Sequence, residues 1–213
     1  MNMSTSTGPI RLLTVDDHPL LRDGIAAMIV NQPDMLLVAE AATGAEGIEK
    51  FRMFRPDVTL MDLRLPDMSG TDSIQAIREE FPAARIIVLT TYTGDVQAGR
   101  ALKAGAYGYL LKSMVRQDLV ETIRAVHQGH RRVPAEIATN MAEHAIDDVL
   151  TKREIEVLKE VASGNSNKIV ASKLSITEDT VKAHMKNVLS KLAANDRTHA
   201  VMIAMKRGFL DSC

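Results

Sequence analysis

PDVTLMDLRLPDMSG, residues 56–70, is the stretch that decides how the chain folds. Its apolar part, Val58 to Met61, is too short for an independent helix and follows Pro-Asp, which favours a buried parallel strand. Pro66 and Gly70 then impose an irregular loop. Asp62 is therefore expected at the carboxyl end of a strand, where open α/β sheets bind their ligands. An acid in this position, taken alone, is equally compatible with a simple loop cap.

The composition is typical of a soluble globular protein large enough for two domains. The chain has 213 residues, of which 46% are hydrophobic and 25% charged. No apolar run approaches the roughly 18 residues needed to span a bilayer. Residues 1–9 are polar without a signal-peptide pattern, so we expect a disordered lead. The single cysteine, Cys213, excludes an internal disulfide framework and fits a cytoplasmic location.

The charge is distributed unevenly along the chain. Residues 1–130 contain 13 basic and 16 acidic residues, whereas residues 148–213 contain 11 basic and 8 acidic ones. The asymmetry is small, but an acidic front and a basic back indicate different partners for the two parts.

The first part of the chain alternates strands with helices. The patterns predict strands over 10–15, 35–39, 58–61, 85–89 and 107–111, and helices over about 19–30, 44–54, 71–80, 95–104 and 115–127. Strict alternation predicts a parallel sheet covered by helices on both faces.

Polar side chains follow four of these strands, and the carboxyl ends of parallel strands meet at one rim of the sheet. The residues concerned are Asp16, Asp17, Asp62, Thr90 and Lys112. Three carboxylates together repel one another and need a cation, for which Mg²⁺ is the natural choice. Asp62, central on the rim, can then act as a carboxylate nucleophile that accepts a phosphoryl group, with Thr90 and Lys112 contacting the phosphoryl oxygens.

Asp16-Asp17, Asp62, Thr90, Tyr109 and Lys112 resemble, residue by residue, the receiver domain of two-component response regulators over about residues 10–128. The resemblance implies a flavodoxin-like sheet and transfer of phosphate to Asp62 from a sensor histidine kinase. Ser113 departs from the family, in which proline often follows the lysine.

The same resemblance implies the metal ligands and the switch. Asp17 and Asp62 would bind Mg²⁺ directly, Asp16 largely through water, and the backbone carbonyl of Arg64 would complete the protein ligands. Thr90 and Tyr109 match the pair whose hydroxyl and ring move when the acceptor aspartate is phosphorylated.

Residues 129–147 are predicted to connect the two domains. Gly129 starts a hinge, Arg131-Arg132 is interpreted as a solvated turn, and Ala135 to Ala145 has helical composition.

The last part of the chain, residues 148–213, is predicted to be all helical. Thr151 with Glu154 forms a capping box, Ser166 and Thr177 cap the next two helices around a tight turn at Ser175-Ile176, and Asn195-Asp196 caps a final one. The helix after Thr177 has one buried stripe, with apolar residues at 181, 185, 188, 189 and 192. This arrangement of two helices around a tight turn, the second with a basic outer face, is typical of a helix-turn-helix motif whose second helix enters the major groove of DNA. The charge alone would also fit an ordinary solvated helix face.

Three quoted stretches resemble the LuxR-type output domain of the NarL/FixJ group: LTKREIEVL at 150–158, SNK at 166–168 and TVKAH at 180–184. The resemblance implies a homodimer on DNA, with the final helix as dimerisation element. The resemblance also implies that Lys182, Ala183 and Lys186 contact the major groove of DNA. By the same resemblance, Thr177, Thr180 and Lys191 would contact the DNA phosphates. His184 could contact the DNA backbone or pack internally. The sequence departs from this group at two positions. Lys152 stands where proline is common in the first turn of the helix, and Ile169 stands where an acidic residue usually follows Ser-Asn-Lys.

Together these features predict a phosphorylation-controlled transcription regulator rather than an enzyme. An aspartyl-phosphate phosphohydrolase usually has a second acid two residues after the nucleophile, and here Arg64 occupies that position. An adaptor that binds protein through its helical tail is the other alternative, and it would lack the steep salt dependence of DNA binding.

Overall fold

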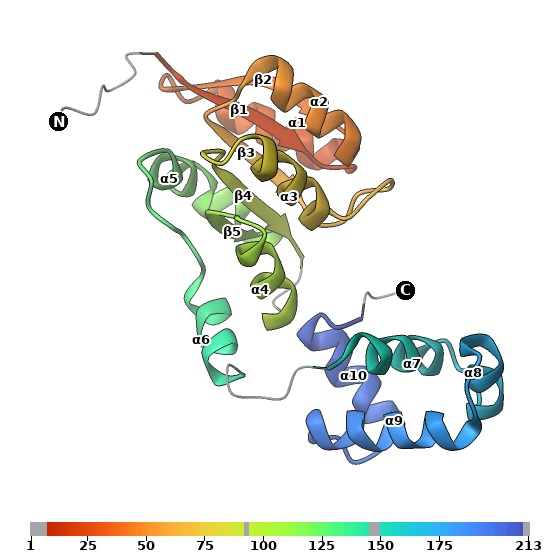
Figure 1. Ribbon diagram of the computed structural model, residues 1–213. Coiled ribbons are helices and arrows are strands. Elements are labelled where there is room, and N and C mark those ends of the chain that lie inside the picture. Colours follow the sequence, from red (N-terminus) through yellow and green to blue (C-terminus); the bar gives the residue numbers. More distant parts are fainter. Residues whose placement is uncertain (1–7, 92–93, 145–149, 211–213) are drawn as a thin grey trace. The chain divides into compact units, whose positions relative to one another are not determined.

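The computed structural model describes residues 8–91, 94–144 and 150–210 (Figure 1). The chain divides into two compact units: the first comprises the residues up to Thr91 together with Gly99–Ala135, and the second comprises the remainder. The expected disordered lead lies almost entirely outside the described residues. No helix in the described ranges is both long and apolar enough to cross a membrane.

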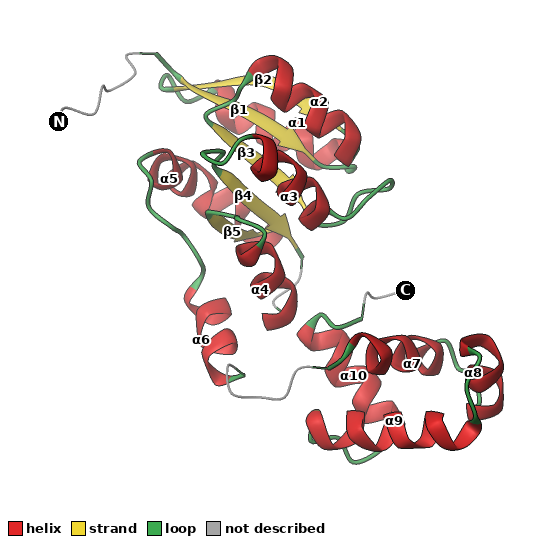
Figure 2. Cartoon of the chain, viewed as in Figure 1, coloured by secondary structure: helices red, strands yellow, loops and turns green. Residues whose placement is uncertain are grey.

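The first unit is built on a five-stranded parallel sheet, which confirms the predicted flavodoxin-like architecture (Figure 2). The strand order is β2-β1-β3-β4-β5. The direction in which successive strands are added therefore reverses between β1 and β3, which is the point where such sheets bind ligands. The strands are β1 (Ile10–Val15), β2 (Met35–Ala41), β3 (Val58–Asp62), β4 (Ile86–Thr90) and β5 (Gly108–Leu111). The central strand β3 and its neighbour β4 are buried along their whole length.

Helices cover both faces of this sheet, and their apolar stripes build the core. The helices are α1 (Pro19–Val30), α2 (Gly44–Phe54), α3 (Gly70–Glu80), α4 (Asp95–Lys103) and α5 (Val115–His127), with a 3₁₀ turn at Lys112–Met114. One core cluster joins Ile25 and Ile29 of α1 and Leu119, Ile123 and Val126 of α5 to one face of the sheet. On the other face α2 packs so closely on β1 that a Cβ on Gly47 would lie 2.9 Å from Val15 Cγ2.

The segment after α5 differs from the prediction. Arg131 and Arg132 are exposed, as expected, but they do not form a turn, because the backbone of Arg132 forms a parallel bridge with Gly108 of β5. The Tyr109 N–H donates to the Arg132 carbonyl (2.8 Å), and the Arg132 N–H donates to the Tyr107 carbonyl (3.1 Å). The Arg131 guanidinium lies 5.5 Å from the centre of the Tyr107 ring. An edge strand offers unpaired backbone groups, and this segment satisfies them; we call residues 131–133 the edge strap.

The second unit is helical. It contains α6 (Ala135–Glu143), α7 (Lys152–Ala162), α8 (Asn167–Leu174), α9 (Glu178–Lys191) and α10 (Arg197–Arg207). The capping box at Thr151 is present with both hydrogen bonds, and Thr177 and Asp196 cap their helices as expected. Ser166 stands at the N-cap of α8 but makes no side-chain capping bond. A tight turn joins α8 to α9, where Ser175 adopts a left-handed conformation with φ of 53°.

The buried stripe of α9 is confirmed, and it holds the helical unit together. Val181, Met185, Val188 and Leu192 are buried among the apolar residues of α7, α8 and α10, while Leu189 is only partly buried. The opposite face of α9 therefore remains available for contacts with a partner.

Candidate functional site

The fold brings the polar rim residues together. Asp16 follows β1, Asp62 ends β3, Thr90 ends β4 and Lys112 follows β5. The Lys112 ammonium lies 2.8 Å from Asp16 Oδ2 and 2.7 Å from Asp62 Oδ2, so it bridges two buried carboxylates. Asp17 lies beside them and is exposed.

The electrostatics of this site leave Asp62 only partly compensated. Burial raises the pKa of Asp62, and the hydrogen bonds from Lys112 and from the Arg64 N–H (3.1 Å) offset this only in part. Burial lowers the pKa of Lys112, but its hydrogen bonds to Asp16 and Asp62 outweigh that effect and raise it above the usual value. The lysine therefore stays charged while it is shared between two acids.

His18 is a member of this cluster that sequence analysis missed. Its ring Nδ1 lies 2.6 Å from Asp17 Oδ1 and 3.1 Å from Asp16 Oδ1. Its backbone N–H donates to Asp16 Oδ1 (2.9 Å). One ligand atom from each of Asp16, Asp17, His18 and Asp62 falls within 4.8 Å of the others. Its position directly after the acidic pair was the available signal, but the sequence indicated only a helix start there.

The acidic cluster has the chemistry of a magnesium site. Carboxylate oxygens are the ligands that Mg²⁺ prefers, and Asp16, Asp17 and Asp62 offer them within a few ångströms. The donor set of these residues therefore fits the ion.

Thr90 and Tyr109 lie next to each other on the neighbouring strands β4 and β5. A hydrogen bond joins their side chains, and burial raises the pKa of the Tyr109 phenol. Tyr109 is only 1% exposed, so its ring is packed inside the first unit.

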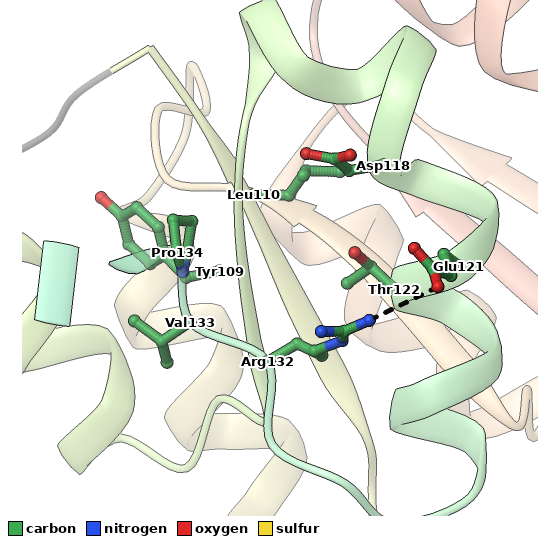
Figure 3. Close-up of a pocket in the computed structure, with 8 residues that line it drawn as sticks. All are labelled: Tyr109, Leu110, Asp118, Glu121, Thr122, Arg132, Val133 and Pro134. Atoms are coloured by element: carbon green, nitrogen blue, oxygen red, sulfur yellow. Dashed lines mark ion pairs between the residues drawn. The ribbon is translucent and has the colours of Figure 1, made fainter. Parts of the chain in front are cut away.

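A cavity of about 200 Å³ opens at the β5 edge beside Tyr109 (Figure 3). β5, α5 and the edge strap line it, and the Arg132 guanidinium forms a 3.8 Å ion pair with Glu121 across it. The strand that carries Tyr109 is thus in direct contact with the start of the connection to the second unit.

The second candidate site is the outer face of α9. Lys182, Ala183 and Lys186 are exposed there, as is Thr177 at its N-cap, whereas Thr180 and His184 are partly buried. The Lys182 ammonium pairs with Asp179 Oδ1 (2.9 Å). Thr177 Oγ1 accepts the Thr180 N–H (3.2 Å), so it is already used as the helix cap.

Lys191, at the end of α9, has a partner inside the helical unit. Its ammonium lies 2.9 Å from Glu154 Oε2, and Glu154 also accepts the Thr151 N–H (2.7 Å). This buried network fixes α9 against the start of α7. The phosphate contact expected of Lys191 stays a prediction, and its ion pair favours a structural role.

Comparison with known proteins matches both units. Residues 12–124 match the family model "Response regulator receiver domain", and residues 148–204 match "Bacterial regulatory proteins, luxR family". The chain belongs to the response regulator family.

Relatives extend over the whole of this response regulator. It is 36% identical to the response regulator protein VraR of Staphylococcus saprophyticus, over 95% of this chain and 99% of that one. It is 35% identical to the transcriptional regulatory protein LnrK of Bacillus subtilis, over 93% and 98%. The crystal structure of response regulator ChrA, from a heme-sensing two-component system, matches 95% of this chain and 100% of its own with 32% identity and a TM-score of 0.56. The protein is therefore a transcriptional response regulator with a receiver and a LuxR-type output domain.

Proposed function

We propose that Asp62 of this response regulator accepts a phosphoryl group and that its phosphorylation state controls DNA binding through α9. The observation that carries the proposal is the Lys112 ammonium, which joins Asp62 to Asp16 on a rim that Thr90 also reaches. Positioning and neutralisation of charge are most of what a phosphoryl-transfer site must supply.

The transfer itself breaks one bond and forms another. A carboxylate oxygen of Asp62 attacks the phosphorus of a phosphohistidine on a sensor kinase, a P–N bond breaks, an acyl phosphate P–O bond forms, and the leaving imidazole takes up a proton. The carboxylates of Asp16, Asp17 and Asp62 and the carbonyl of Arg64 would hold Mg²⁺. When bound, the ion neutralises charge on the phosphoryl oxygens.

Lys112 and Thr90 then contact the phosphoryl group from the protein side. Lys112 already lies 2.7 Å from an Asp62 oxygen, so its ammonium is placed to offset the added negative charge. The Thr90 hydroxyl, bonded to Tyr109 here, would turn towards a phosphoryl oxygen and alter the packing of that ring. The receiver would thus have two states whose populations phosphorylation shifts.

The proposed DNA site is the exposed face of α9. Lys182, Ala183 and Lys186 would face base edges in the major groove, and Thr177 and Thr180 would contact phosphates. Two copies bound to paired half-sites would present two such helices, with α10 as the dimerisation element.

The test is selection of genomic DNA fragments by the full chain, with and without acetyl phosphate and Mg²⁺, for the wild type, Asp62→Asn and Asp72→Asn. Asp72→Asn makes the same change of charge at an exposed position in α3. We expect phosphate-dependent enrichment in the wild type and in Asp72→Asn but not in Asp62→Asn. Equal enrichment in all samples would leave a DNA-binding protein without this switch, and no enrichment in any would favour the protein-binding adaptor.

A further inference from the structure

The loop that follows Asp62 is attached at its tip to a helix from another part of the receiver. Asp67 lies in this loop, and its carboxylate accepts the N–H groups of Gly44 (2.8 Å to Oδ1) and Ala45 (2.9 Å to Oδ2). Gly44 and Ala45 are the first two residues of α2. Met68 packs on the same point, because a Cβ on Gly44 would collide with Met68 Cγ.

The base of the loop is closed by separate contacts. Arg64 and Ser69 form an antiparallel bridge, and the Gly70 N–H donates to the Leu63 carbonyl (2.9 Å). A Cβ on Gly70 would collide with the carbonyl oxygen of Asp62, so the chain passes close to the nucleophile's own backbone. The loop is therefore fixed at two points, its base and its tip.

Asp67 satisfies donors that the N-cap of α2 does not reach. The first N–H groups of a helix lack intrahelical partners and attract negative charge. Thr43 Oγ1 accepts the Glu46 N–H (3.2 Å), whereas the two preceding N–H groups point to Asp67. The hydrogen bonds from Ala45 and Gly44 lower the pKa of Asp67, so this acid is ionised at neutral pH.

We propose that Asp67 is a positioning residue for the phosphoryl-transfer site. It holds the loop so that the Arg64 carbonyl and the Asp62 carboxylate keep the separation that a shared divalent ion requires. This inference rests on the proposed function of Asp62. Asp67 acts through the loop and touches neither the metal nor the phosphoryl group.

The physical consequence concerns metal affinity more than maximal rate. Without the tip contact the loop samples more conformations, and metal binding has to order it again. Groups that orient metal ligands from outside the first coordination shell affect affinity in this way. Loss of the hydrogen bonds between Asp67 and α2 should therefore weaken Mg²⁺ binding, and saturating Mg²⁺ should restore most of the phosphorylation rate.

The experiment compares Asp67→Asn with Asp72→Asn in the full chain. Both remove one negative charge from an exposed position near the rim, but only Asp67 contacts α2. Ala45→Pro is the second variant. It deletes one of the two donors while it keeps the charge of Asp67, and proline is tolerated in the first turn of a helix. Mg²⁺ affinity is measured by calorimetry, and the rate of acetyl phosphate incorporation is measured as a function of Mg²⁺ concentration.

We expect Asp67→Asn and Ala45→Pro each to raise the Kd for Mg²⁺ about tenfold, with a maximal rate close to that of wild type. The double variant should lose less than the product of the two effects, because both remove the same contact. If Asp67→Asn has the same Mg²⁺ affinity as Asp72→Asn, the contact of Asp67 with α2 does not position the site and the inference is overturned. If the wild type itself neither binds Mg²⁺ nor takes up phosphate, the proposed function fails instead.

Discussion

Asp62 in the receiver and Glu154 in the output domain are both buried carboxylates, each 3% exposed, and each contacts a lysine ammonium. Burial by itself would raise the pKa of both acids, but the net shift of the pKa differs between them. For Glu154, the N–H and hydroxyl of Thr151 and the ammonium of Lys191 outweigh burial, and its pKa is lowered. Asp62 shares Lys112 with Asp16, and its pKa remains raised.

The difference separates a structural acid from a reactive one. Glu154 has a full set of donors and links α7 to the end of α9. Asp62 is short of positive charge, which a divalent cation can supply. Sites that keep a buried acid under-compensated are where binding and catalysis concentrate. Three predictions test this contrast and a fourth tests the DNA-binding face of α9; they run from the largest expected effect to the smallest.

Removing the lysine from each pair should have different consequences in the two domains. Lys112→Ala leaves Asp16 and Asp62 without their shared ammonium and should cost the receiver about 3–5 kcal/mol of unfolding free energy in the absence of divalent ions. Millimolar Mg²⁺ should restore part of this stability, because it binds only the folded site. Urea unfolding with and without Mg²⁺ measures both effects. Lys191→Ala is the matched control, and a Mg²⁺ rescue of that variant as well would contradict the contrast.

Glu154→Gln should destabilise the output domain by about 2–3 kcal/mol at neutral pH, because it replaces a charged acceptor in a buried network. The folded-state pKa of Glu154 is lowered, so its contribution is complete above the unfolded pKa of about 4.3 and is lost as the pH falls through the folded value. The difference in stability between wild type and variant should therefore shrink in acid. A difference that stays constant down to pH 3 would show that the charge of Glu154 is not what stabilises the domain.

Lys182→Ala should lower affinity for a selected DNA fragment about tenfold, within the usual range of about 1–3 kcal/mol for a groove contact. Fluorescence anisotropy with that fragment and with unrelated DNA of equal length measures the effect. Lys159→Ala makes the same charge change on the exposed side of α7 and should have little effect. Equal losses on both DNAs would mean that Lys182 contacts phosphate rather than a base edge.

Asp62→Asn should stabilise the receiver by about 1 kcal/mol at neutral pH without Mg²⁺, because it removes a charge that is costly to bury and, to a smaller extent, relieves repulsion from Asp16. The folded pKa of Asp62 is raised, so the cost of ionising it is absent below the unfolded pKa of about 3.9, grows as the pH rises from there, and is complete above the folded value. Thermal unfolding at pH 3.5 and 7 should show the gain only at the higher pH. A gain at both values would point to packing instead of charge.

The parts that sequence analysis could anticipate are those encoded by neighbouring residues. The strands carry their own patterns, and parallel pairing places their last residues on one rim, which located Asp16, Asp62, Thr90 and Lys112. The caps at Thr151, Thr177 and Asp196 were visible for the same reason.

Contacts between residues far apart in sequence escaped that analysis. The hydrogen bonds of Asp67 with α2 and the ion pair of Lys191 with Glu154 each join segments more than 20 residues apart. Nothing local marks such a pair, because an exposed acid in a loop or a lysine at a helix end has an ordinary explanation. The edge strap is a similar case, since its residues show no strand pattern and pair only because β5 offers an open edge.

The edge strap also bears on where the receiver can be cut. A fragment that ended at Gly129 would keep every strand and helix of the sheet domain but would lose Arg132, and with it the partners of the Tyr109 N–H and the Tyr107 carbonyl. Those bare groups would lie on a sheet edge, where a second molecule could add its own strand and start self-association. An isolated receiver that stays monomeric should therefore extend through Pro134, beyond its last helix, α5.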